Sequence, residues 1–257
     1  MQAPTWTRRV ARSFTLQVTI VGSLLLLMWL VEAVDNLFFR GGLDQFGVWP
    51  RYPAGLWGIL FAPFLHANFA HLAANSVPFA FLGWLILVRG LGDYIIVTVA
   101  VMVSSGLGTW LLGASDSIHI GASGIVFGYF GFLLLRAVYE RSLVAMSSAL
   151  IVIMLYGSFI WGVFPLMVGV SWQMHLFGFV GGAIIARVLA ERQTPSVKED
   201  ENLDGDLVIV DYRDVEETDG IIRLSNRRFE PFAPGKLTIN EADLDDLFNQ
   251  GDVEPKH

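Results

Sequence analysis

The sequence predicts an all-α membrane protein with six transmembrane helices and an acidic, soluble C-terminal tail. Hydrophobic residues make up 54% of the 257 residues and charged residues only 16%, whereas soluble proteins are about 25% charged. Several apolar runs are long enough to cross a bilayer. Charge is divided unevenly: residues 1–190 carry nine arginines, no lysine and six acidic residues (+3), whereas residues 191–257 carry eight basic and eighteen acidic residues (−10). We therefore predict a short N-terminal segment (1–15), a membrane domain (16–190) and a tail (191–257).

The first apolar run, residues 16–34, follows three arginines and resembles the start of a signal peptide. We interpret it as a retained helix, because the run is long, no A-x-A site follows it, and more apolar runs come after it. The other five predicted spans are residues 69–88, 93–112, 121–137, 143–164 and 170–190. Residues 35–68 are too apolar for a free loop and too interrupted by Gly and Pro for a span, which predicts a partly embedded interfacial loop.

Arginines predict the orientation of this multi-pass integral membrane protein. Most lie on one face: in the N-terminal segment, at Arg89, at Arg136 and Arg141, and at the end of the last span (Arg187 and Arg192). Of the connections on the opposite face, only the first carries arginines, Arg40 and Arg51. By the positive-inside rule the face with most arginines is cytoplasmic, so both termini are expected in the cytoplasm, at the cell membrane if the organism is bacterial. Ser123 and His175 then enter the membrane from the outer face at similar depth.

The tail and the composition narrow the function classes. No cysteine is present, which excludes disulfides and thiol catalysis, and no basic stripe indicates nucleic-acid binding. We predict that the tail is mostly disordered, with short strands at 206–212 and 221–224 and an amphipathic turn at 240–248 that offers a docking element to a cytoplasmic partner.

A small alcohol, Ser123, opens a long apolar segment between Gly121 and Gly124. On its own, such a serine is more often a packing residue in a face of small residues spaced four apart. Two such pairs are present: Gly124 with Gly128, and Gly178 with Gly182. Close approach of the fourth and sixth spans would also permit a Ser–His hydrogen bond of roughly 2.6–3.2 Å, the geometry of an activated nucleophile.

His175 lies inside the last apolar run. An ionisable side chain within a membrane span needs a polar partner and often marks a functional site. One interpretation is a structural imidazole bonded to a backbone carbonyl. The other is a general base for Ser123. No acidic residue lies in a mid-membrane position to orient the ring, so we predict a dyad, with Phe127 stacked on the imidazole.

His71 and Asn75 are four residues apart and share a face of the second span. Two polar side chains there could donate hydrogen bonds to an oxyanion, together with the Ser123 N–H, or could line a water-filled cavity. We expect His66 to brace the embedded loop. A zinc site of His66, His71 and His175 is a minor alternative, because no further ligand has suitable spacing; we predict no metal and no cofactor.

Together these motifs resemble the signatures of the rhomboid intramembrane serine proteases. The residues that carry the resemblance are His66-xxxx-His71-xxx-Asn75, Gly121-Ala-Ser123-Gly124 and His175-xx-Gly178-xxx-Gly182, in order over residues 16–190. The resemblance implies a six-helix rhomboid-type bundle and a serine endopeptidase that cleaves transmembrane segments of other membrane proteins. It implies Ser123 as nucleophile, His175 as base, and His71 and Asn75, with Gly121, at the oxyanion and substrate site.

Two positions depart from the family pattern, and two other functions remain open. The Trp-Arg pair of the family's first loop falls at Trp57-Gly58, so the arginine is absent, and an aromatic that is often Tyr is Phe127. The alternatives are a catalytically silent rhomboid-like protein that binds membrane clients, and a small transporter with a polar path. For a protease, substrate entry requires the second and fifth spans to part, with candidate gate residues at Phe159, Trp161 and Phe164.

Overall fold

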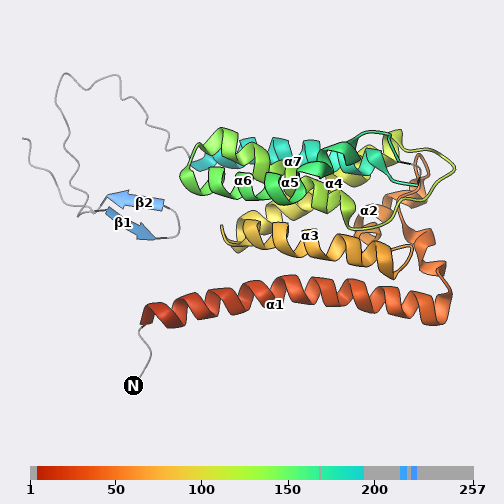
Figure 1. The fold of residues 1–257 in the computed structure, drawn as a ribbon, viewed down its shortest axis with the longest axis horizontal. Coiled ribbons are helices and arrows are strands. Elements are labelled where there is room, and N and C mark those ends of the chain that lie inside the picture. The colour runs from red at the N-terminus through yellow and green to blue at the C-terminus, as the bar shows by residue number, and fades with distance from the viewer. Residues whose placement is uncertain (1–4, 168, 194–214, 219–220, 225–257) are drawn as a thin grey trace, which may run out of the picture. The chain divides into compact units, whose positions relative to one another are not determined.

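The computed structural model describes residues 5–167, 169–193, 215–218 and 221–224. The chain divides into two compact units, residues 1–197 and 198–257. In the described part of the first unit, all regular structure is helical apart from one isolated bridge between Val48 and His119. Among the residues that the structure describes, six helical segments are long and apolar enough to cross a membrane, which confirms the predicted number of spans. Figure 1 shows these helices running roughly alongside one another.

The helices follow the predicted apolar runs closely. Their bounds are α1 Thr5–Val34, α3 Phe69–Leu87, α4 Leu91–Leu112, α5 Ser123–Glu140, α6 Leu143–Tyr156 continued by a 3-10 segment at Gly157–Val163, and α7 Trp172–Gln193. The main difference lies at the N-terminus, where α1 begins at Thr5, inside the predicted N-terminal segment of residues 1–15. No glycine or proline occurs between Thr5 and Val21 to stop the helix.

Helix α5 lies at the centre of the bundle and α1 at its edge. Of the membrane-crossing stretch of α5, 61% of residues are buried, against 11% for α1. The largest buried side chains of α5 are Tyr129, Phe130 and Phe132. Figure 1 shows α1 beside α3 and separate from the cluster of α4, α5, α6 and α7. The central position of α5 surrounds its first residue, Ser123, with neighbouring helices.

Helices α5 and α7 approach each other at glycines. A Cβ at Gly178 would overlap the Gly124 carbonyl oxygen, and a Cβ at Gly182 would overlap the Gly128 carbonyl oxygen. Small residues let helix backbones come this close in a membrane. The predicted packing of the fourth and sixth spans on these glycine pairs is therefore confirmed.

The interfacial loop after α1 consists of short helical turns. They are a π-helical turn at Asp35–Phe39, 3-10 turns at Gly42–Phe46, Pro53–Leu56 and Ala62–Phe64, and α2 at Gly58–Phe61. A Cβ at Gly58 would overlap the Gly47 carbonyl oxygen, so this position requires glycine. Arg51 joins the loop to the α4–α5 connection, because its guanidinium donates to the Gly113 carbonyl oxygen (2.8 Å) and to Ser115 Oγ (2.6 Å).

One carboxyl in this loop is placed unfavourably for its charge. Burial, and next the nearby Asp35 carboxylate, raise the pKa of Asp44 to about 6, and Asp44 Oδ1 has no hydrogen-bond partner within the described part of the chain. Because the folded-state pKa lies above the unfolded value, Asp44 contributes stability at pH below about 4 that is lost as the pH rises through about 6.

We therefore expect Asp44→Asn to raise the melting temperature of the detergent-solubilised protein at pH 7.5. Allowing for solvent screening, a gain of ~1 kcal/mol corresponds to about 2–4 °C. The difference from the wild type should disappear near pH 4, where Asp44 is protonated in both states. Melting curves recorded from pH 4 to pH 8 test this, and a pH-independent difference would contradict it.

The second unit contains a β-hairpin. Strands β1 (Val215–Thr218) and β2 (Ile221–Leu224) pair antiparallel, with Val215 opposite Leu224. Residues 221–224 were predicted as a strand and form one. The predicted strand at 206–212, the amphipathic turn at 240–248 and the expected disorder of the tail lie outside the described residues.

Candidate active site

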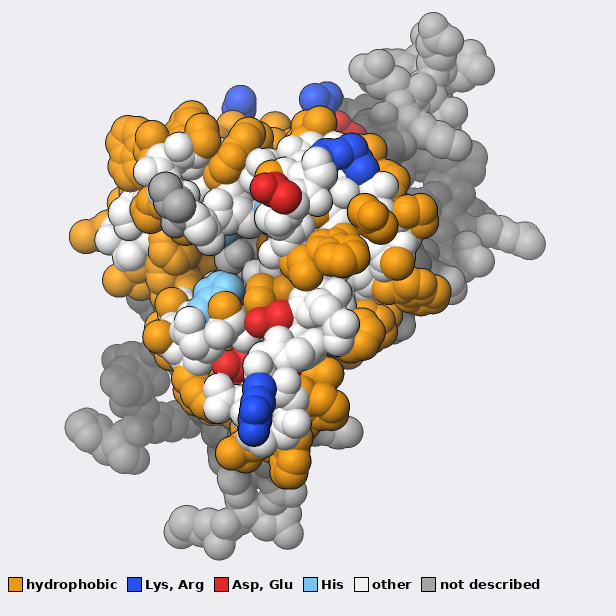
Figure 2. Space-filling view, turned by 90° about the vertical axis from the view of Figure 1, so that its right-hand side faces the viewer, with side chains coloured by type: hydrophobic (Ala, Val, Ile, Leu, Met, Phe, Trp, Pro, Cys, Tyr) orange, Lys and Arg blue, Asp and Glu red, His pale blue; other side chains and the backbone are white. Residues whose placement is uncertain are grey.

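A pocket of about 760 Å³ opens among the ends of three membrane helices. Its lining includes Ser123 at the start of α5, His175 in the first turn of α7, and His71 and Asn75 in the first two turns of α3. Figure 2 looks onto this end of the bundle and shows histidine surface at the edge of a hollow. The structure thus brings together four side chains that lie up to 104 positions apart in the chain.

Ser123 is the first residue of α5, with Ala122 at the N-cap position. The first N–H groups of a helix have no partner within it, and the Ser123 N–H makes no hydrogen bond among the described residues. The Ser123 hydroxyl lines the pocket, but in the described structure no hydrogen bond joins it to His175. The expected Ser–His bond is therefore absent in this state, as is common for catalytic hydrogen bonds before substrate binds.

The His175 ring is held on two sides. Its Nδ1 lies 3.0 Å from the Gly162 carbonyl oxygen, and Phe127 stacks on it with ring centroids 3.9 Å apart and planes at 5°. Since a carbonyl oxygen can only accept, Nδ1 carries the hydrogen, and Nε2 of a neutral ring is the nitrogen with a free lone pair. The predicted stacking on Phe127 is confirmed. The ring is also bonded to a backbone carbonyl, as the structural interpretation of His175 expected, and this carbonyl orients the ring as a carboxylate would.

The polar pair on α3 offers hydrogen-bond donors to the pocket. Asn68 caps α3 by accepting the His71 N–H at 2.9 Å. His71 and Asn75 are four residues apart within this helix and therefore lie on one face. Asn75 is 7% exposed, and its Nδ2 has no partner among the described residues. A buried, unused donor costs free energy, which is offset where a ligand supplies the acceptor.

Gly121 and His66 position the segment before Ser123. The Gly121 N–H donates to the Ala62 carbonyl oxygen at 2.8 Å, so it is occupied and Gly121 contributes space instead. Its φ of +108° favours glycine, and a Cβ would lie 2.8 Å from His71 Cε1. His66 Nε2 accepts the Ala122 N–H at 3.3 Å. Burial, and next the neighbouring His71, lower the pKa of His66 to about 4, so the ring stays neutral as this contact requires.

Two features of the site were not predicted. The first is Gly162, which was not singled out from the sequence. A side chain at this position would press on Phe127 and His175, because a Cβ would lie 2.5 Å from Phe127 Cζ and 3.3 Å from His175 Nδ1. Ser117 and His119 form a second pair in the pocket wall, with Ser117 Oγ 2.9 Å from His119 Nε2. His119 also pairs with Val48 through two backbone hydrogen bonds, and we interpret it as a brace for the loop.

The zinc alternative and the candidate gate residues have different outcomes in the structure. Among the described residues, no group of three His, Cys, Asp or Glu side chains is placed to hold a metal ion, so the zinc alternative with His66, His71 and His175 finds no support there. Of the candidate gate residues, Phe159 lines the pocket and stacks on Phe127, whereas Trp161 and Phe164 are exposed. Their role in entry stays a prediction.

The fold and the pocket define an integral, multi-pass membrane protein with serine, histidine and asparagine side chains gathered between its helices. Residues 53–192 match the family model of the Rhomboid domain. The chain is 39% identical over 190 residues to an uncharacterized protein of Mycobacterium tuberculosis (70% of this chain, 79% of the relative). It is 40% identical over 205 residues to an uncharacterized protein of Mycobacterium leprae (76% and 80%).

A more distant relative carries a functional name. The chain is 28% identical over 141 residues to YdcA of Bacillus subtilis, which is provisionally named a rhomboid protease, with 54% of this chain and 70% of YdcA covered. The match to the family model covers more than half of the chain. The protein belongs to the rhomboid family.

Proposed function

We propose that the protein is an intramembrane serine endopeptidase in which Ser123 is the nucleophile and His175 the general base. The observation that carries the proposal is the fixed His175 ring. Its Nδ1 is bound to the Gly162 carbonyl oxygen and its face is stacked on Phe127. This arrangement leaves Nε2 as the basic nitrogen in the pocket that also contains Ser123.

The chemistry follows from these positions. Ser123 Oγ attacks the scissile carbonyl carbon while His175 Nε2 takes the hydroxyl proton, giving a tetrahedral intermediate. The Ser123 N–H, the Asn75 amide and the His71 ring donate hydrogen bonds to the negatively charged oxygen. His175 then returns the proton to the leaving amine, and a water molecule activated in the same way releases the acyl group from Ser123.

The substrates we propose are transmembrane segments of other membrane proteins. A peptide bond within a helix is protected by the helix's own hydrogen bonds, and unsatisfied backbone groups are costly in lipid. The pocket at the helix ends offers donors and room for water. We therefore expect small or helix-breaking residues near the cleaved bond, where local unwinding costs least.

The test is cleavage of a labelled single-span substrate by the purified protein in liposomes. We expect wild-type cleavage and no detectable cleavage by Ser123→Ala, because no nucleophile remains. The matched control is Ser117→Ala, which removes a hydroxyl from the same pocket without touching the proposed machinery and should keep activity within about threefold. Equal cleavage by wild type and Ser123→Ala would refute the proposed nucleophile.

Two other outcomes would favour the alternative functions. Substrate capture without cleavage by the wild type, across several helix-destabilised segments, would favour a client-binding protein. Solute flux through the liposomes that persists in Ser123→Ala would favour a transporter. The proposal predicts neither.

A further inference from the structure

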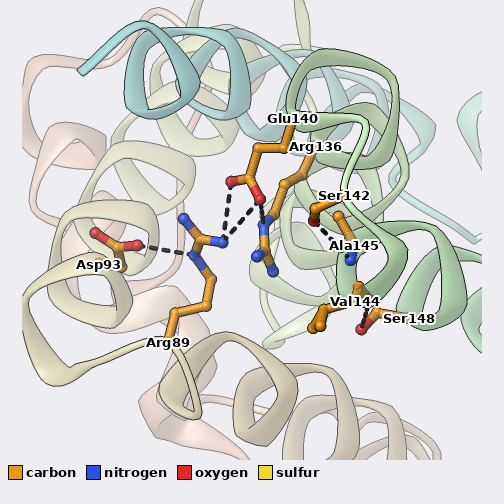
Figure 3. A network of polar contacts seen from close by, with 8 residues as sticks. All are labelled: Arg89, Asp93, Arg136, Glu140, Ser142, Val144, Ala145 and Ser148. Carbon is orange, nitrogen blue, oxygen red and sulfur yellow. Dashed lines mark hydrogen bonds and ion pairs between the residues drawn. The ribbon is translucent and has the colours of Figure 1, made fainter. Parts of the chain in front are cut away.

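A second polar cluster lies at the far end of α5 from Ser123. Arg136 is thirteen residues after Ser123, or about 20 Å along the helix axis. It stands with Arg89, Asp93 and Glu140 where α3, α4 and α5 end or begin (Figure 3). This cluster plays no part in the proposed catalysis, and the side chains of both arginines are at least nine-tenths buried.

The acceptors of the cluster are engaged by the two arginines. Arg89 Nε lies 2.8 Å from Asp93 Oδ2, and Arg89 Nη1 lies 2.9 Å from Glu140 Oε1. Glu140 Oε2 lies 2.7 Å from Arg136 Nε. Each Glu140 oxygen therefore faces an arginine.

The cluster contains more hydrogen-bond donors than its acceptors can satisfy. Among the described residues, the buried Arg89 Nη2 has no hydrogen-bond partner. Arg136 makes its ion pair through Nε, which leaves its two outer nitrogens outside that pair. Figure 3 shows the outer end of this guanidinium directed away from Glu140, into the space beside Val144 and Ser148 at the start of α6. The Ser142 side chain caps only the Ala145 N–H there, so the N–H groups of Leu143 and Val144 remain without a helical partner.

This space is a pocket of about 270 Å³, lined by Leu85, Val88, Arg89, Arg136, Val144 and Ser148. Its volume equals that of about nine liquid water molecules, so a phosphate group fits. The exposed side chains at its rim, Val88 and Val144, are apolar, as expected where a pocket meets lipid. Guanidinium groups, a helix N-terminus and a hydroxyl are the groups that bind phosphate.

We propose that this pocket binds a phosphate group, supplied by the headgroup of an anionic phospholipid or by free phosphate. The pocket lies between membrane helices at their ends, where a lipid headgroup has direct access, and basic pockets of this kind bind anionic lipids. Arg136 donates through its outer nitrogens, and the start of α6 contributes its N–H groups and positive dipole end.

The experiment is native mass spectrometry of the full-length protein titrated with phosphatidylglycerol or phosphatidylcholine. We expect the wild type to retain phosphatidylglycerol about tenfold better than phosphatidylcholine. Val144→Glu places a carboxylate at the rim of the pocket on an exposed position and should abolish the preference. Leu143→Glu, the matched control, adds the same charge one residue away on an exposed side chain that does not line the pocket, and should retain it.

Arg136→Gln supplies a second variant, which removes the donor itself and should also lose the preference. Competition with inorganic phosphate distinguishes the two sources: displacement of the lipid shows that phosphate alone is bound, and retention shows that the lipid is required. Equal retention of the two lipids by the wild type would overturn the proposal. So would an equal loss of preference in Val144→Glu and Leu143→Glu.

Discussion

Replacing His175 with asparagine is expected to reduce cleavage by about 10³-fold or more, to the level of Ser123→Ala. The asparagine amide can take the place of Nδ1 and still donate to the Gly162 carbonyl oxygen, but no atom replaces Nε2. The substitution therefore removes the base while preserving the contact that holds α7 to the Gly157–Val163 segment. Because nucleophile and base act as one unit, the double variant should be no slower than either single variant.

The matched control is His119→Asn, the same substitution at another buried histidine in the same pocket wall. His119 contacts Ser117 rather than Phe127, so we expect cleavage within about tenfold of the wild type. Initial rates in liposomes, with melting curves to verify folding, provide the comparison. Retention of a tenth of the activity by His175→Asn would contradict the assignment of the base.

The number of membrane helices and most of their limits could be predicted because lipid imposes simple rules on sequence. Apolar runs must reach across the bilayer, and breaks fall at Gly, Pro and charged residues. The α1 start at Thr5 could not be predicted from hydropathy, since polar residues outside the bilayer also form helix. The short turns of the interfacial loop depend on backbone contacts such as Gly58 on Gly47, which leave no periodic pattern in the sequence.

The candidate site was predictable where side-chain chemistry is unusual for its surroundings. His175 and the His71–Asn75 pair stand out because polar groups in apolar helices need partners. Gly162 could not be recognised, because its contribution is a carbonyl oxygen that every residue has. Its identity matters only after folding has brought it against Phe127 and His175. The paired state of the Gly121 N–H likewise depends on the distant Ala62.

The second large effect is expected at Gly182, where a single methyl group should destabilise the bundle. In Gly182→Ala the new Cβ overlaps the Gly128 carbonyl oxygen and lies 2.9 Å from Phe132 N. These are backbone atoms of a central helix, which cannot move aside as a flexible side chain can. Overpacking costs about 1–3 kcal/mol, and separation of α5 from α7 adds to this, so we expect the melting temperature to fall by about 5–10 °C.

The same substitution at Gly22 should have the opposite sign, which separates packing from helix propensity. Gly22 lies within α1, and a Cβ there would meet no atom of the described residues within 4 Å. Alanine forms helix more favourably than glycine by about 1 kcal/mol, so Gly22→Ala should raise the melting temperature by about 2–4 °C. Gly182→Ala receives the same gain in helix propensity, so it destabilises the protein only because the steric cost at α5 exceeds that gain. Because α7 carries His175 and α5 carries Ser123, separation of the two helices also moves the base from the nucleophile. The Gly182→Ala variant should therefore cleave more slowly than the wild type even at a temperature where it is folded, whereas Gly22→Ala should cleave normally. Equal melting temperatures for the two variants would show that α5 and α7 are not held together by direct contact at these glycines.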